Sequence, residues 1–217
     1  AILHPEVTEG TRCQAGTTIA TIEASMATLL TGERVALNLA MRLSGIATAT
    51  RKFVNCLTGT PAQLVDTRKT TPGLRLLEKY ASRVGGAMNH RMGLDDAVMI
   101  KDNHIAAAGG IPAAVTQIRK GIPYPMTIEV ETTSLDQVAE ALACDIDIIM
   151  LDNMDIETMG LAVQRIRDTR PTVKIEASGN VTLERLQQIA ATGVDYISTS
   201  APITRSAWLD LSMRLVR

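Results

Sequence analysis

The stretch Ile146-Asp147-Ile148-Ile149-Met150-Leu151-Asp152 decides the fold, together with the amphipathic segment over residues 155–168 and the second apolar run over 173–177 that follow it. A continuous apolar run of this length, ended by a polar residue, is typical of a strand that is buried on both faces of a parallel sheet. The segment between the two runs has the three- and four-residue apolar spacing of a helix. Strand, helix and strand in this order predict a parallel βαβ unit.

The same alternation of apolar runs and helical segments continues along most of the chain from residue 62. Ser134 and Gln137 have the spacing of a capping box, which predicts where one of these helices begins. Six strands are too many for a single crossover unit, so the pattern predicts either an α/β barrel or an open doubly wound sheet. The predicted strands are 63–66, 97–100, 127–130, 146–151, 173–177 and 196–199, and the predicted helices lie near 74–84, 111–120, 134–143, 155–168 and 182–191.

The two ends of the chain have different patterns. A short β-type run lies over residues 17–22, and a long helical pattern over 35–57 is ended by Gly59-Thr60-Pro61. Residues 209–215 alternate apolar and polar side chains, which predicts a half-buried strand that pairs with the β unit at the start. We therefore expect a partial N-terminal domain with the long helix over 1–60, a catalytic α/β domain over 61–205 and a returning strand over 206–217.

The bulk composition excludes several classes of protein. Lys and Arg number 22 against 23 Asp and Glu, and aromatic residues make up 2%, so we expect neither a basic nucleic-acid coat nor a base-stacking module. Cys13, Cys56 and Cys144 have neither disulfide-framework nor zinc-site spacing, which favours a reducing cytoplasm. No run reaches membrane-spanning length and no signal peptide is visible, so we expect no membrane partner. The chain begins in mid-pattern at Ala1, which we interpret as the loss of its true N-terminus.

Polar or charged residues follow every predicted strand. In parallel α/β folds the carboxyl ends of the strands converge on one face, where active sites lie. Two further cationic residues, His90 and Arg91, lie in a polar string between the first two strands. In chain order, the residues at the strand ends are Arg68 and Lys69, Lys101, Glu131, Asp152, Ser178-Gly179-Asn180, and Ser200.

These strand ends divide by chemistry. The early cations suit carboxylates on a substrate, and the late Ser-Gly-Asn turn before a helix suits a phosphate. Glu131 and Asp152 suit sugar hydroxyls, Mg²⁺ or a developing positive charge. We interpret Glu176 as the structural partner of a buried cation and Asp66 as a brace for neighbouring cations. The residues alone predict an enzyme that joins an anionic small molecule to a phosphorylated sugar.

Eight strings in the chain are similar to those of a known enzyme family. The chain resembles quinolinate phosphoribosyltransferase, the carboxylating nicotinate-nucleotide pyrophosphorylase, over essentially its whole length. The strings are long and keep their order, which makes a chance match improbable. They are Glu33-Arg34-Val35-Ala36-Leu37-Asn38, Asp66-Thr67-Arg68-Lys69-Thr70-Thr71-Pro72-Gly73, Asn89-His90-Arg91-Met92-Gly93-Leu94, Ile100-Lys101-Asp102-Asn103-His104, Glu129-Val130-Glu131, Leu151-Asp152-Asn153-Met154, Ala177-Ser178-Gly179-Asn180 and Gly193-Val194-Asp195-Tyr196-Ile197-Ser198.

The resemblance implies a reaction and a fold. Quinolinate attacks the anomeric carbon of phosphoribosyl pyrophosphate, pyrophosphate leaves with Mg²⁺, and the ring 2-carboxylate is lost as CO₂ to give nicotinate mononucleotide for NAD biosynthesis. The implied fold is an open, TIM-like α/β barrel beside an N-terminal α/β sandwich domain, assembled at least as a homodimer.

The resemblance also implies a role for each matching residue. The quinolinate pocket is formed by Arg34, Arg68, His90, Arg91 and Lys101, with Arg34 entering the neighbouring subunit's site. Lys69, Glu131 and Asp152 are catalytic, Glu131 and Asp152 hold Mg²⁺, and these three bind phosphoribosyl pyrophosphate together with Ser178, Gly179, Asn180 and Ser200. Ser200 replaces a glycine of the family pattern, and Arg205 stands in for a basic loop residue.

Two other functions remain open on the sequence. One is a sister phosphoribosyltransferase for another acidic aromatic substrate, against which Arg91 and Lys101 argue because a monocarboxylate needs fewer cations. The other is a non-catalytic phosphosugar-binding homologue. His104 either orients Lys101 or caps the segment that follows.

Overall fold

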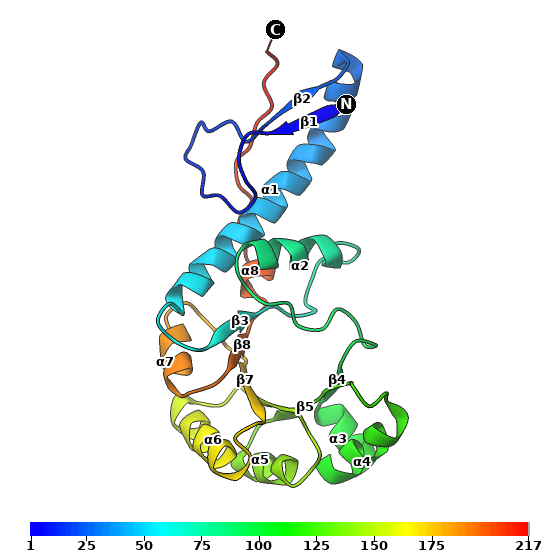
Figure 1. The fold of residues 1–217 in the computed structure, drawn as a ribbon, viewed down its shortest axis with the longest axis vertical. Coiled ribbons are helices and arrows are strands. Elements are labelled where there is room, and N and C mark those ends of the chain that lie inside the picture. The colour runs from blue at the N-terminus through cyan, green and yellow to red at the C-terminus, as the bar shows by residue number, and fades with distance from the viewer. Residues whose placement is uncertain (217) are drawn as a thin grey trace.

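The computed structural model describes residues 1–216 and divides them into a small N-terminal unit and an α/β barrel. The strands β1 (Ile2–Pro5) and β2 (Ala20–Glu23) pair antiparallel, and the helix α1 (Met26–Cys56) runs from them to the barrel, as Figure 1 shows. The Ser25 side chain caps α1 by accepting from the Thr28 amide at 3.3 Å. The long helix was therefore predicted correctly, although it begins earlier than the apolar pattern indicated.

Six parallel strands form the barrel wall in the order β3-β8-β7-β6-β5-β4. The strands β3 and β4 lie at the two edges and do not pair with each other, so the barrel is open (Figure 1). One parallel bridge between Val65 and Met88 extends the β3 edge. The bounds are β3 (Gln63–Val65), β4 (Val98–Ile100), β5 (Ile128–Thr132), β6 (Ile148–Asp152), β7 (Lys174–Ser178) and β8 (Tyr196–Ser198). All six strands lie where the apolar runs predicted them, and the α/β fold class is confirmed.

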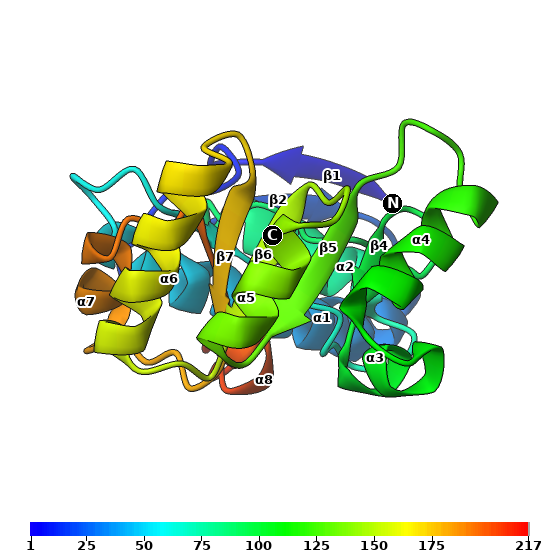
Figure 2. The same cartoon turned by 90° about the horizontal axis from the view of Figure 1, so that it is seen from below.

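The helices of the barrel lie outside the wall, and Figure 2 shows α4, α5 and α6 along its outer face. Two of these helices, α3 and α8, were not predicted. Their bounds are α2 (Arg75–Val84), α3 (Asp102–Ala108), α4 (Ile111–Gly121), α5 (Leu135–Leu142), α6 (Ile156–Thr169), α7 (Leu186–Ala191) and α8 (Ala201–Thr204). The Ser134 hydroxyl accepts from the Gln137 amide at 3.2 Å, which confirms the predicted cap of α5. In the described part of the chain, no helix combines the length and the apolar character needed to cross a membrane.

The two faces of the barrel wall differ in chemistry. Ile128 and Val130 on β5 are fully buried and belong to the apolar core that includes helix residues such as Ile166. Because side chains alternate along a strand, Glu129 and Glu131 point to the opposite face, which is the barrel interior. The register sets Glu131 beside Met150 and Met150 beside Glu176 across three strands. The interior of this barrel is therefore partly carboxylate, whereas its outer layer is aliphatic.

The last segment corrects one prediction. Residues 206–216 contain no strand and run beside α1, where the Leu209 amide donates to the Met41 carbonyl at 3.1 Å. The chain passes so close to the helix that a side chain on Gly45 would overlap the Ala207 carbonyl. The expected returning strand does not form because a helix, whose carbonyls are already paired within itself, offers no row of free partners for a ladder.

Candidate active site

The carboxyl end of the barrel joins a cation on β4 to a carboxylate on β5. Lys101 follows β4 directly, and its Nζ pairs with Glu131 Oε2. The Glu131 side chain is 13% exposed and that of Lys101 is 43% exposed, so the pair sits at the mouth of the barrel. The His104 Nδ1 accepts from the Lys101 amide at 3.0 Å, which shows that His104 caps α3.

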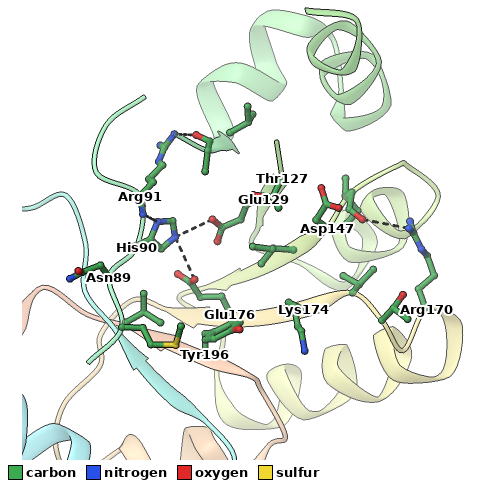
Figure 3. Close-up of a pocket in the computed structure, with 18 of the residues that line it drawn as sticks. Asn89, His90, Arg91, Thr127, Glu129, Asp147, Arg170, Lys174, Glu176 and Tyr196 are labelled. Atoms are coloured by element: carbon green, nitrogen blue, oxygen red, sulfur yellow. Dashed lines mark hydrogen bonds and ion pairs between the residues drawn. The ribbon is translucent and has the colours of Figure 1, made fainter. Parts of the chain in front are cut away.

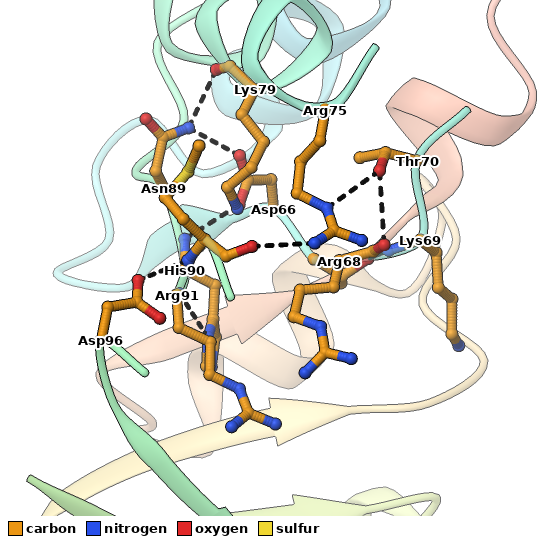
Figure 4. Close-up of polar contacts among 12 residues, drawn as sticks. Asp66, Arg68, Lys69, Thr70, Arg75, Lys79, Asn89, His90, Arg91 and Asp96 are labelled. Atoms are coloured by element: carbon orange, nitrogen blue, oxygen red, sulfur yellow. Dashed lines mark hydrogen bonds and ion pairs between the residues drawn. The ribbon is translucent and has the colours of Figure 1, made fainter. Parts of the chain in front are cut away.

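Two arginines place their guanidinium groups beside the barrel mouth, where Figure 4 shows them pointing towards the same region. Arg68 donates to the Gly93 carbonyl at 3.4 Å, and Arg91 donates to the Ala97 carbonyl at 3.0 Å. Burial, and then the positive charge of Arg68, lower the pKa of the Arg91 guanidinium. The buried Nε of Arg68 has no hydrogen-bond partner among the described residues. Two neighbouring cations with unmet hydrogen-bonding capacity favour an acidic ligand.

A buried ion pair holds the backbone of this region. Asp66, 3% exposed, pairs with the Nζ of Lys79 from α2 and accepts from Asn89 Nδ2 at 2.6 Å and from the His90 amide at 2.9 Å. Asp66 therefore ties the end of β3 to α2 and to the string that carries His90 and Arg91 (Figure 4). The predicted brace is present, but its cation is Lys79 and not the neighbouring Arg68.

A second buried carboxylate holds the loop after β3. Glu78 is fully buried, accepts from the Thr71 amide and hydroxyl at 2.8 Å each, and pairs with Arg42 of α1 at 2.8 Å. Arg42 also donates to Ser206 at 2.9 Å. The long helix is thus linked to the loop that presents Arg68. The sequence analysis missed Glu78, whose apolar helical surroundings gave no sign of a site.

His90 lies inside the barrel, against two buried carboxylates. Its Nε2 is 3.1 Å from Glu129 Oε2 and 3.5 Å from Glu176 Oε2, as Figure 3 shows, while its Nδ1 accepts from the Arg91 amide at 2.8 Å. Burial alone lowers the pKa of the His90 imidazole, but the hydrogen bonds to Glu129 and Glu176 outweigh it and raise the pKa to about 10. Burial and the charge of Glu176 raise the pKa of Glu129, although His90 opposes this. Glu176 was interpreted as the structural partner of a buried cation, and the structure places it beside His90 Nε2.

A tight turn follows β7 at the same end of the barrel. Gly179 has φ +88° and Asn180 φ +47°, and a side chain on Gly179 would overlap Asn153 Oδ1 and lie 2.9 Å from the Asn153 amide nitrogen. The Asn180 amide donates to Asn153 Oδ1 at 3.1 Å, and Asn153 donates to Asp152 Oδ2 at 2.7 Å. The turn after β7 is thereby locked to Asp152 at the end of β6.

A cavity of about 540 Å³ adjoins these residues and reaches towards the opposite end of the barrel (Figure 3). Thr127, Lys174 and Tyr196, at the amino ends of their strands, line it. Of the predicted site residues within the described chain, His90 and Arg91 alone line this cavity. Glu129 and Glu176, the carboxylates that contact His90, line the same cavity. We assign the site to the barrel mouth and not to this cavity, because most of the charged strand-end residues gather at the mouth.

Three predicted residues lie at the margins of this arrangement. Lys69 is exposed next to Arg68, and Ser200 is the residue before α8. Arg34 is exposed in the first half of α1, the half that follows β2 in the chain. The fold thus brings the strand-end residues of the prediction to one face and leaves Arg34 outside it.

Two groups of residues have the donor atoms of a metal site. Glu131 and Asp152 offer carboxylate oxygens at adjacent strand ends, which is the donor type that Mg²⁺ prefers. The ligand atoms of His90, Glu129 and Glu176 lie within 4.8 Å of one another. In that second group the Nε2 lies at hydrogen-bond distance from the carboxylates, so it forms a proton-sharing cluster rather than an ion cage.

The fold and the site define an α/β-barrel protein that gathers cationic and carboxylate side chains at the carboxyl ends of its strands. A model of the quinolinate phosphoribosyl transferase C-terminal domain matches residues 46–214, and one of the N-terminal domain matches residues 2–44. The chain therefore belongs to the quinolinate phosphoribosyl transferase family.

Individual relatives agree with the family models. A probable nicotinate-nucleotide pyrophosphorylase [carboxylating] of Synechocystis is 63% identical over 209 residues, which are 96% of this chain and 71% of the relative. The corresponding Mycobacterium leprae protein is 46% identical over 96% of this chain and 73% of its own length. The crystal structure of NadC from Streptococcus pyogenes superposes with a TM-score of 0.92 at 42% identity, covering 98% of this chain and 74% of that one.

Proposed function

We propose that this chain transfers the phosphoribosyl group of phosphoribosyl pyrophosphate to quinolinate and releases CO₂. The ring nitrogen forms a bond to the anomeric carbon while the bond to pyrophosphate breaks. The bond between the ring and its 2-carboxylate then breaks, CO₂ leaves, and the electron pair left on the ring carbon takes up a proton. The product is nicotinate mononucleotide, as the names of the relatives imply.

The observation that carries this proposal is the pair formed by Arg68 and Arg91. Their mutual repulsion and partial burial cost free energy in the absence of an anion. A dicarboxylate offers four acceptor oxygens, which match the unused donors of two planar guanidinium groups. Lys101, at the next strand end, supplies a third cation within the same face of the barrel. A monocarboxylate would leave part of this charge without a partner.

Glu131 and Asp152 suit the sugar half of the reaction. The positive charge that develops on the ribose ring when pyrophosphate leaves is stabilised by carboxylates held at a fixed distance. The same two groups would hold Mg²⁺, whose chemistry when bound is to neutralise the departing pyrophosphate. Asp152 is kept in place by Asn153, and Glu131 by Lys101. None of these steps requires a covalent nucleophile.

The turn Ser178-Gly179-Asn180 suits the 5′-phosphate. Its positive φ angles turn successive backbone amides to one side, which is the geometry of an anion-binding nest. Ser200 stands at the next strand end and completes this part of the proposal. Lys69, exposed beside Arg68, is placed between the two substrates in this scheme.

The proposal is tested by mixing the protein with phosphoribosyl pyrophosphate, Mg²⁺ and quinolinate that carries ¹⁴C in its 2-carboxylate. We expect labelled CO₂ and one equivalent of nicotinate mononucleotide by chromatography. Arg91→Met should raise the KM for quinolinate at least tenfold, whereas Arg119→Met, which removes an arginine paired with Asp147 at the other end of the barrel, should not. Turnover of nicotinate in place of quinolinate would favour the sister activity, and ligand binding without turnover would favour a non-catalytic role.

Assembly as a homodimer in the cytoplasm is part of the same proposal. Arg34 is exposed in the first half of α1, outside the strand ends that form the site of its own chain, as expected of a residue that completes a neighbouring subunit's pocket. Mixing inactive Arg34→Ala with inactive Arg68→Ala tests this, because subunit exchange restores one intact site in a mixed dimer. Recovered activity supports the shared site, and no recovery in a sample proven to exchange subunits argues against it.

A further inference from the structure

The hydrogen bonds of the cluster formed by His90, Glu129 and Glu176 determine which of its atoms can carry protons. The Arg91 amide donates to His90 Nδ1 at 2.8 Å, so this nitrogen carries no proton and the ring is the neutral Nε2–H form. The Nε2–H then faces two carboxyl groups at 3.1 and 3.5 Å. If both carboxyl groups were ionised, the cluster would hold two negative charges in a nearly dry site, which is costly.

One additional proton resolves this conflict. Glu129 and Glu176 are each 3% exposed, and each has a second oxygen, Oε1, without a hydrogen-bond partner in the described structure. With the imidazole neutral, a proton shared by the two carboxyl groups leaves the cluster with a net charge of −1, whichever of the two holds it.

We propose that Glu129 and Glu176 are positioning residues that orient the His90 ring so that its Nδ1 holds the Arg91 backbone and aims the Arg91 guanidinium at the acidic substrate. This inference rests on the proposed function, and it explains why two carboxylates lie behind a pocket built to receive a dianion. They do not face the substrate, because the His90 ring stands between them and Arg91 (Figure 3). Their single negative charge also offsets part of the repulsion between Arg68 and Arg91.

The test compares removal of the carboxyl groups with their conservative replacement. Glu129→Ala and the double variant Glu129→Ala with Glu176→Ala leave the Nε2–H with fewer or no acceptors, so we expect the KM for quinolinate to rise about tenfold or more in the double variant. The KM for phosphoribosyl pyrophosphate should stay within about twofold. Glu129→Gln keeps an acceptor oxygen and imitates a protonated carboxyl group. Its KM for quinolinate should therefore stay within about threefold of the wild-type value.

Two controls separate positioning from a merely structural effect. Asp147→Ala removes a carboxylate that pairs with Arg119 and accepts from the Ile128 amide at the far end of the barrel, and it should leave both KM values unchanged. Nitrogen NMR of ¹⁵N-histidine-labelled protein reports the tautomer directly, and we expect the unprotonated Nδ1 of His90 in the wild type and its loss in the double alanine variant.

The outcomes are distinct. If the wild-type protein does not turn over quinolinate, the proposed function fails, but the NMR result still decides the tautomer. If the wild type is active and the double alanine variant keeps its KM for quinolinate, the positioning proposal fails. A protonated Nδ1 in the wild type would also overturn it, and so would an equal rise of both KM values.

Discussion

Replacing Lys79 by methionine tests how much the region behind the site depends on the buried pair with Asp66. The side chains of Lys79 and Asp66 are 1% and 2% exposed. Methionine keeps the length of the lysine stem, so the change removes the charge with little change in volume. Asp66 is then a buried carboxylate without its cation.

The expected cost follows from burial and the remaining contacts. Removing one partner of a buried ion pair costs about 3–5 kcal/mol. Asp66 keeps its hydrogen bonds from Asn89 Nδ2 and the His90 amide, which places the expected loss near the lower end, at about 3 kcal/mol. This is a large part of the roughly 5–15 kcal/mol that stabilises a typical domain.

Urea unfolding followed by circular dichroism measures this loss. With a slope of about 2–3 kcal/mol per molar, the midpoint should fall by roughly 1–1.5 M. Lys174→Met is the matched control, because Lys174 is 55% exposed and its Nζ is 3.9 Å from Asp195, so its loss should stay below about 1 kcal/mol. The double variant Asp66→Asn with Lys79→Met should be more stable than Lys79→Met alone. A Lys79→Met protein within about 1 kcal/mol of the wild type would refute the reasoning.

Three further changes address the turn, the loop and the buried cluster. Gly179→Ala introduces a side chain at φ +88° that overlaps Asn153, so steady-state kinetics should show the KM for phosphoribosyl pyrophosphate rising about tenfold with that for quinolinate little changed. Glu78→Gln weakens the bonds to Arg42 and the loop, and thermal unfolding should show a loss of about 1.5–3 kcal/mol. The cluster of His90, Glu129 and Glu176 retains one proton as the pH rises from 6.5 to about 10. Stability present below pH 6.5 should therefore fall by up to about 1.4 kcal/mol per pH unit as the pH rises through the interval, and the double variant Glu129→Gln with Glu176→Gln, which cannot hold this proton, should remove the slope.

The strand ends were predictable because they depend on local patterns. Each apolar run marks a buried strand, and the parallel topology forces the carboxyl ends onto one face, so the positions of Lys101, Glu131 and Asp152 follow from sequence order. The helix α3 was missed because its first three residues, Asp102, Asn103 and His104, are polar, and the rest of the helix is too short to show an apolar spacing of three or four residues. The strand expected over 206–216 was wrong because alternation shows which side chains face a neighbour but not whether that neighbour is a strand or a helix.

Contacts between distant parts of the sequence were not predictable in the same way. Nothing near His90 in the sequence indicates that its ring meets Glu129 and Glu176, since that contact depends on how the Asn89-His90-Arg91 string crosses the open edge of the barrel. In the sequence, Glu78 and Arg42 likewise have the pattern of ordinary helix residues. Only the packing of α1 against α2 makes them a buried pair. Residue type and strand order identify the groups that gather at the strand ends, whereas the groups that hold them in place are identified by tertiary contacts.

The buried carboxylates explain how this barrel can gather cations at its mouth without losing stability. Each of these carboxylates accepts an N–H group from a segment close to a cationic site residue. Asp66 accepts from the His90 amide, Glu78 from the Thr71 amide in the loop after Arg68, and the Glu129–Glu176 pair from the His90 ring. Their charges are satisfied by Lys79, by Arg42 and by a retained proton, so they are not free to neutralise Arg68 or Arg91 directly. A direct ion pair would fill the guanidinium donors, and an incoming carboxylate would then have to break it. Holding the backbone while leaving the guanidinium groups unpaired keeps the attraction for an acidic ligand available, and that attraction is strongest where burial keeps water out.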